Sequence, residues 1–87
     1  MAMTPAEIED SVMKMDEIRI VIRAPSNAKL GDYIYQRKAA DNASVVEWLD
    51  QRIRPIVSGH DVVVIDGNGA SPHGRTKLAT LRATYEH

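Results

Sequence analysis

The residues most able to carry chemistry lie in a loop near the C-terminus, which runs Gly69-Ala-Ser-Pro-His-Gly74-Arg75-Thr76. The glycine spacing is that of a phosphate-binding loop, in which a lysine and the amides of a following helix hold the phosphates. Arginine stands at the lysine position, and the eleven residues after Thr76 leave no strand for an acidic magnesium ligand. We therefore expect a surface loop. A weaker alternative is that backbone amides with Arg75 and Lys77 bind one phosphate or carboxylate.

The same loop offers polar and basic side chains to a protein partner. Glycines, an asparagine and a proline between positions 67 and 74 supply turns at low steric cost. Loops of this kind, held by a rigid scaffold, often carry binding residues. The predicted partner-binding residues are Asn68, Ser71, His73, Arg75 and Lys77.

A second set of basic and aromatic residues is typical of proteins that bind single-stranded nucleic acid. On paired strands, Tyr33 and Tyr35 would lie among guanidinium groups, where they could stack on bases while the arginines neutralise phosphates. The residues of this alternative are Arg19, Arg23, Tyr33, Tyr35, Arg37 and Arg82. The favoured interpretation is that both tyrosines point inward and help to fill a core that lacks phenylalanine.

The remaining titratable residues form no catalytic or metal-binding pattern. His60, His73 and His87 are scattered, without the spacing of a helical zinc motif. Ser71 lies close to His73, but no nucleophile-elbow motif is present. We therefore expect a protein that is not an enzyme, with no catalytic residues, no metal site and no cofactor.

Length and composition set further bounds. A chain of 87 residues has room for one domain, and the absence of cysteine excludes disulfides, thiolate zinc sites and a catalytic thiol. No apolar run approaches the ~18 residues of a membrane span, and the acidic N-terminus lacks the basic and apolar regions of a signal peptide. These features predict a soluble cytoplasmic protein without membrane contact.

The net charge of −1 conceals an uneven distribution. Residues 1–17 hold five acids against Lys14, whereas residues 18–87 hold ten Lys and Arg against seven acids, which leaves +3. That charge is below the strong basicity of dedicated nucleic-acid modules. Ordinary solvated surface charge is the favoured interpretation.

The N-terminal segment predicts a short helix. Thr4 and Glu7 have the spacing of a capping box, with proline between them at the first helical position, and a helix over about residues 5–14 should follow. Ile8, Val12 and Met15 give it one apolar stripe. A helix of this length is marginal alone. We interpret residues 1–17 as an accessory helical extension and residues 18–87 as a single α+β domain.

Two strands are expected next. Ile18, Ile20 and Ile22 alternate with polar or smaller residues, which predicts a half-buried strand over residues 18–24. Residues 32–39 alternate as well and are bracketed by turn signals, which predicts a second strand. The two should pair, because sequential strands joined by a short connection usually lie side by side.

A main helix and two further strands complete the pattern. Ser44 and Glu47 form a second capping box, and Pro55 should end the regular helix near Ile53, followed by a kinked or 3₁₀ turn. Trp48 lies beside the apolar stripe and is expected in the core. Residues 62–65 are an unbroken β-branched run and predict a buried strand. Residues 76–86 fit a helix or a strand, and the recurring threonines favour the strand.

The predicted order is a helix followed by ββαββ, with one helix packed on a four-stranded, mainly antiparallel or mixed sheet. This order over residues 18–86 resembles that of the β-grasp (ubiquitin-like) fold. The resemblance implies a fold and carries no function with it.

Elimination and size favour a small non-catalytic protein-interaction module. It would act as an adaptor or inhibitor, of the kind common among accessory and regulatory proteins of bacteria and phages, and would bind a protein partner through a sheet edge or through the loop 67–75. The alternative is the single-stranded nucleic-acid-binding module. A small enzyme or ligand binder centred on the loop ranks last. Homodimerisation through an edge strand or the N-terminal helix is a further expectation.

Overall fold

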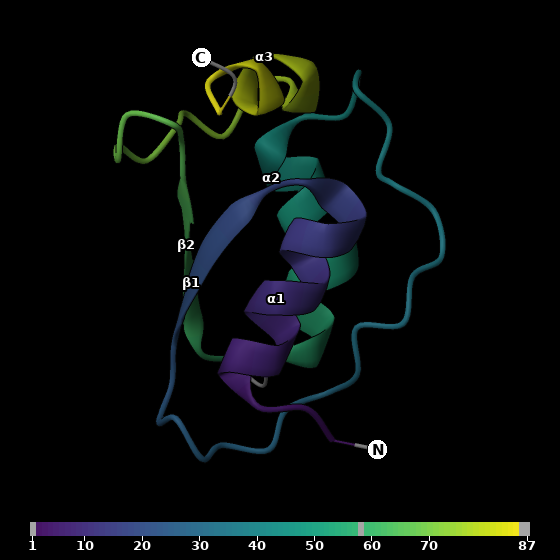
Figure 1. Cartoon of the computed structure of the whole chain (residues 1–87), viewed down its shortest axis with the longest axis vertical. Coiled ribbons are helices and arrows are strands. Elements are labelled where there is room, and N and C mark those ends of the chain that lie inside the picture. The colour runs from purple at the N-terminus through teal and green to yellow at the C-terminus, as the bar shows by residue number, and fades with distance from the viewer. Residues whose placement is uncertain (1, 58, 86–87) are drawn as a thin grey trace.

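Three helical segments and a short antiparallel sheet form the described part of the protein (Figure 1). The computed structural model describes residues 2–57 and 59–85. The elements in chain order are α1 (Pro5–Asp16), β1 (Arg19–Arg23), α2 (Val45–Trp48), η1 (Leu49–Ile53), η2 (Arg54–Ile56), β2 (Asp61–Ile65) and α3 (Leu78–Ala83). In Figure 1 the two strands run along one side of α1 and α2, and the irregular connection between β1 and α2 runs around the other side.

The sheet has two strands, so the predicted four-stranded, β-grasp-like sheet is wrong. β1 pairs antiparallel with β2, with Arg19 opposite Ile65, Val21 opposite Val63 and Arg23 opposite Asp61. In the described part of the chain no further strand joins these two. The fold is therefore a small domain of helices and a two-stranded antiparallel sheet.

Residues 32–39, predicted as a strand beside β1, belong to the irregular connection. Tyr33 and Ala39 are buried, but residues 34–38 between them are all exposed, so burial does not follow the alternation of the sequence, and no backbone ladder forms along the segment. The amide of Gly31 donates to the carbonyl of Ile56 (2.8 Å), and that of Ala39 donates to the Asp16 carboxylate (2.8 Å). The backbone is thus held at separate points on other elements, which replaces a strand neighbour.

The end of the chain is helical where a strand was predicted. Leu78 and Leu81, three residues apart, are both fully buried, and this spacing places them on one face of α3. Burial of the two leucines outweighs the strand preference of the neighbouring threonines, which is a weak and context-dependent effect. The prediction of a strand over residues 76–86 is therefore wrong for its described part, and position 86 lies outside the described residues.

Both predicted capping boxes are present. The Thr4 hydroxyl accepts from the Glu7 amide and the Glu7 carboxylate accepts from the Thr4 amide, and Ser44 and Glu47 make the same reciprocal pair. In each pair the backbone hydrogen bond to the carboxylate is the main cause of a lowered glutamate pKa. The local signals thus fixed where α1 and α2 begin.

The main helix changes geometry along its length, as Pro55 predicted. Regular α-helix over α2 gives way to a π-helical turn in η1 and a 3₁₀ turn in η2. Proline has no amide to donate and disfavours α geometry in the residue before it. The predicted 3₁₀ turn at Pro55 is present, but the regular α-helix ends at Trp48 and not near Ile53, which is fully buried at the end of the π-helical turn.

One hydrophobic cluster unites the elements. It includes Ile8 and Val12 of α1, which are fully buried, together with Ile20 of β1 and Val64 of β2. Trp48 is 2% exposed and belongs to the same cluster, as predicted. No helix in the described residues is long and apolar enough to cross a membrane.

Candidate functional site

The two strands differ in what covers their outer edges. On β1 the amide of Ile22 donates to the Glu9 carboxylate of α1 at 2.8 Å. That amide therefore points away from β2, which makes Ile22 and its partner Val62 a non-hydrogen-bonded pair of the antiparallel ladder. A side chain from α1 thus occupies the edge of β1.

The edge of β2 is open. In an antiparallel ladder the pair types alternate, so Val62 and Val64 both direct their amide and carbonyl groups away from β1. Among residues 2–57 and 59–85, β1 is the one strand that pairs with β2, and no other backbone or side-chain group bonds to the main chain of these two valines. The open edge consists of these four polar groups.

Turns limit the open edge at both ends. After β2, the amide of Asp66 donates to the carbonyl of Ala70 (2.8 Å), and the Asp66 carboxylate accepts from the amides of Asn68 (2.8 Å) and Ala70 (2.9 Å). Before β2, the amide of His60 donates to the carbonyl of Val57 (3.0 Å). Because these amides are already bonded, strand pairing on this edge is confined to β2 itself.

The loop that follows β2 is pinned to neighbouring helices. Its first residue, Gly67, lies so close to α3 that a Cβ atom there would be 1.6 Å from the Thr84 carbonyl oxygen. Further along, the Gly74 and Thr76 carbonyls accept from the first amides of α2, each at 2.9 Å. The helix that follows the loop is α3, and its first amides are bonded as well, because those of Leu78 and Ala79 donate to the carbonyls of Ala43 (2.8 Å) and Asp41 (3.1 Å) and so do not face a phosphate.

The five predicted partner-binding residues lie at the surface, four of them on this loop and Lys77 directly before α3. The residue at position 68 lies in the turn after β2, and the other four lie at alternate positions along the returning arm. All are exposed, namely Asn68, Ser71, His73, Arg75 and Lys77. In this arm, His73 uses its Nδ1 to accept from the Arg75 amide at 3.1 Å.

The residues of the nucleic-acid alternative do not share one face. Arg19 and Arg23 are exposed on the outer face of β1, but Tyr33 is buried, with its hydroxyl bonded to Asp16. Tyr35 packs against Tyr33 at 5.0 Å between ring centroids and lies under the guanidinium of Arg52, 4.2 Å from its ring centroid. The other two members are separated as well: Arg37 is exposed on the irregular connection and Arg82 is buried on α3.

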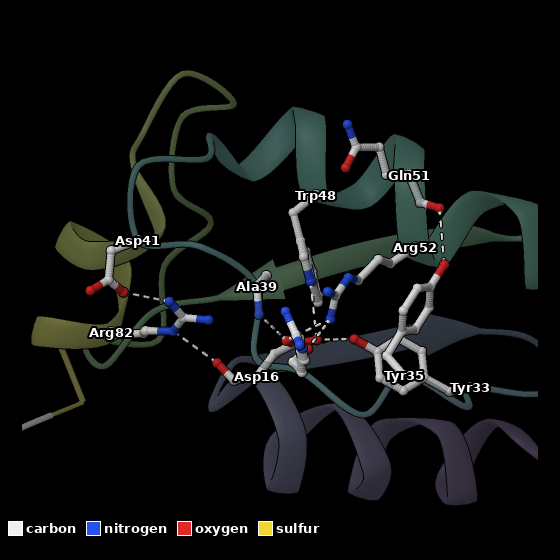
Figure 2. Close-up of polar contacts among 10 residues, drawn as sticks. Asp16, Tyr33, Tyr35, Ala39, Asp41, Trp48, Gln51, Arg52 and Arg82 are labelled. Carbon is white, nitrogen blue, oxygen red and sulfur yellow. Dashed lines mark hydrogen bonds and ion pairs between the residues drawn. The ribbon is translucent and has the colours of Figure 1, made fainter.

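The most elaborate polar cluster centres on Asp16, which the sequence reasoning missed (Figure 2). Its carboxylate is fully buried and accepts from the Tyr33 hydroxyl, from Trp48 Nε1 (3.2 Å) and from Arg52 Nη1 (3.0 Å). With the bond from the Ala39 amide, each carboxylate oxygen has two donors. A carboxylate with both oxygens so occupied acts as an anchor and has no free lone pair for acid–base chemistry.

A sequence signal for this anchor does exist. Ile8, Val12 and Asp16 follow one another at intervals of four residues, so the carboxylate continues the apolar stripe of α1. A charged residue in line with a buried stripe must be paired if the helix packs over its whole length. Its partners are far away in sequence and could not be identified from spacing.

Arg82 connects this anchor to two adjoining clefts. Its Nε donates to the Asp16 carbonyl (2.9 Å) and its Nη1 to the Asp41 carboxylate (2.6 Å). One cleft of about 370 Å³ is lined by Met13, Glu17, Arg19, Arg82 and Tyr85. The second, of about 190 Å³, shares Glu17 and Arg82 with it.

Charges around these clefts are largely paired. A hydrogen bond from Lys38 is the main cause of the lowered pKa of Glu17. Burial raises the pKa of Tyr85, whose hydroxyl donates to the Ile65 carbonyl and accepts from the Arg19 amide at 3.1 Å. No group of three or more potential metal ligands occurs among the described residues.

Comparison with protein-family models, with curated proteins and with solved structures gave no match.

Proposed function

We propose that the protein is a small interaction module that binds an extended protein segment along the open edge of β2. The observation that carries this proposal is the difference between the strands: Glu9 occupies the edge of β1, whereas Val62 and Val64 present four backbone groups that pair with no group in residues 2–57 and 59–85. An extended peptide added to such an edge gains main-chain hydrogen bonds for affinity. Side-chain contacts then provide specificity.

The exposed loop supports this location. The turn at Asp66 brings the loop to one end of the open edge, and the polar residues predicted to bind a partner lie on that loop. A bound strand would therefore meet backbone groups along β2 and side chains such as Asn68 beside its end. Adaptors and inhibitors use edges of this kind, and no catalytic chemistry is required.

The test compares Val62→Pro with Val62→Ala. Proline removes the outward amide of Val62 without removing a bond to β1, and edge strands tolerate proline at such positions. Alanine keeps the amide and loses a similar amount of partly buried side chain, so the pair isolates the hydrogen bond.

We expect peptides selected from a displayed random library to bind the wild type and Val62→Ala and to lose at least about tenfold in affinity for Val62→Pro. The same peptides should slow amide exchange at Val62 and Val64. Equal binding to both variants, or protection confined to other residues, would contradict the proposal. Failure to select any binder would remove its support.

Single-stranded nucleic-acid binding stays a prediction. Its residues are divided between the exposed face of β1, the irregular connection and the buried side of α3. Retention on single-stranded RNA or DNA that weakens steeply with salt would favour it over the edge proposal.

A further inference from the structure

We infer that the strand occupying the open edge is β2 of a second copy of this chain, paired antiparallel about a twofold axis at Val63. The inference rests on the proposed function, because it names the partner of the same edge. It would join two two-stranded sheets into one continuous four-stranded sheet. A two-stranded ribbon is marginal by itself, and addition of strands stabilises it.

The backbone groups of the edge select this register. With the axis at Val63, Val62 of one copy lies opposite Val64 of the other, and both pairs exchange two hydrogen bonds. All four outward groups of each copy are then used. The edge is thus complementary to itself, as a twofold interface requires.

The neighbouring registers need amides that are already bonded. An axis at Val64 would pair Val62 with Asp66, whose amide donates to Ala70. An axis at Val62 would pair Val64 with His60, whose amide donates to Val57. An axis between two residues would place backbone groups that point toward the second copy opposite groups that point away from it. The turns at the two ends of β2 therefore leave Val63 as the axis.

Charge favours the antiparallel direction. Around Val63, Asp61 of one copy lies opposite Ile65 of the other, so no like charges meet. Parallel pairing in register would instead place Asp61 beside Asp61, which is destabilising. On the solvent face, Val63 would contact its own copy, with the 44% exposed Val21 beside each.

The interface is small. Four backbone hydrogen bonds and a short row of valines fall below the ~1,200 Å² of stable complexes. We therefore expect a reversible dimer whose population rises with concentration.

A single cysteine tests the register directly, because the chain contains none. At the axis the two Val63 Cα atoms would be about 4.5 Å apart, within the range of a disulfide. Val63→Cys should therefore form a covalent dimer under mild oxidation. The matched control is Val21→Cys, on the same face but separated from its copy by three strand spacings, about 14 Å.

Charge variants at the same position provide a second test that needs no oxidation. Val63→Glu and Val63→Lys should each be monomeric, because like charges would meet at the axis, and an equimolar mixture should recover the dimer. Light scattering and sedimentation would measure the masses. In the same assay Val62→Pro should raise the dissociation constant at least about tenfold relative to Val62→Ala, since each copy loses one donor.

Two outcomes would overturn the inference. One is a wild type that stays monomeric at millimolar concentration while Val63→Cys cross-links no faster than Val21→Cys. The edge proposal would then stand or fall separately on the peptide experiment. The other is a wild-type dimer that Val62→Pro does not weaken relative to Val62→Ala, because its interface would lie elsewhere.

Discussion

The two sides of the sheet show how neighbouring strands acquire different roles. β1 and β2 are equally long and both rich in β-branched residues. The β1 side is closed by α1: the Glu9 carboxylate occupies the strand edge, and the Asp16 carboxylate accepts from two donors of the irregular connection and from two donors of α2 and η1. The β2 side ends in an open edge and an exposed loop. The two strands therefore have similar strand propensity, and the difference between their edges comes from α1, which lies beside β1.

The largest loss of stability is expected from removal of the Asp16 carboxylate on the β1 side. Asp16→Ala would leave three side-chain donors without their acceptor, including the guanidinium of Arg52, which is 17% exposed. Removal of one partner of a buried ion pair costs about 3 to 5 kcal/mol. Urea unfolding should show that the free energy of unfolding falls by that amount. The irregular connection should also lose its attachment to α1.

The matched control for this change is Asp50→Ala. Asp50 pairs with Arg54 at 2.8 Å on the surface, with both side chains more than half exposed. Such pairs contribute about 0 to 1 kcal/mol. Similar losses for the two aspartates would show that Asp16 does not anchor the fold.

A smaller effect is expected from making the two edges alike. Glu9→Ala removes the acceptor of the Ile22 amide, which costs about 1 to 2 kcal/mol for a partly buried donor. Hydrogen exchange at Ile22 should then become as fast as at Val62 and Val64. Glu9→Gln keeps an oxygen acceptor and should retain slow exchange. Slow exchange in Glu9→Ala would mean that the body of α1, and not this carboxylate, closes the edge.

The seam between the strands should be sensitive to alkaline pH. Tyr85 joins the end of both strands through its hydroxyl, and burial raises its pKa above the ordinary value of 10.0. A raised pKa in the folded state means that this contribution to stability is complete below pH 10.0 and is lost as the pH rises through the folded value.

Tyr85→Phe should therefore cost about 1 kcal/mol at neutral pH and reduce the alkaline loss of stability. Unfolding experiments over a range of pH, with ultraviolet titration of the tyrosines, would measure both. An unchanged alkaline slope in Tyr85→Phe would assign that slope to other groups.

Local signals in the sequence predicted local structure well. The capping boxes of α1 and α2, the alternation of Ile20 and Ile22, and the effect of Pro55 each depend on residues within one or two turns, and the structure confirms them. The surface position of the loop 67–75 was predictable for the same reason, because glycines and proline determine it locally.

Long-range competition explains the errors. Residues 32–39 alternate in sequence like a strand, but bonds from Tyr33 and Ala39 to α1 and from Arg52 of η1 hold them instead of a ladder. In α3, the full burial of Leu81 on one helix face outweighed the strand preference of the neighbouring threonines. The sequence predicted that some strand would have an open edge. Which strand keeps its edge open depends on the bond between Glu9 and the Ile22 amide, 13 residues away in sequence.

The smallest effect on stability, and a sharp test of the open side, is expected from Arg75→Ala. The side chain is exposed and makes no ion pair among the described residues. The free energy of unfolding should therefore change by less than about 0.5 kcal/mol. If the loop contacts the segment bound on β2, the variant should weaken binding of a selected peptide while Asp50→Ala leaves it unchanged. Equal binding by both variants would show that Arg75 takes no part in recognition of the segment bound on β2.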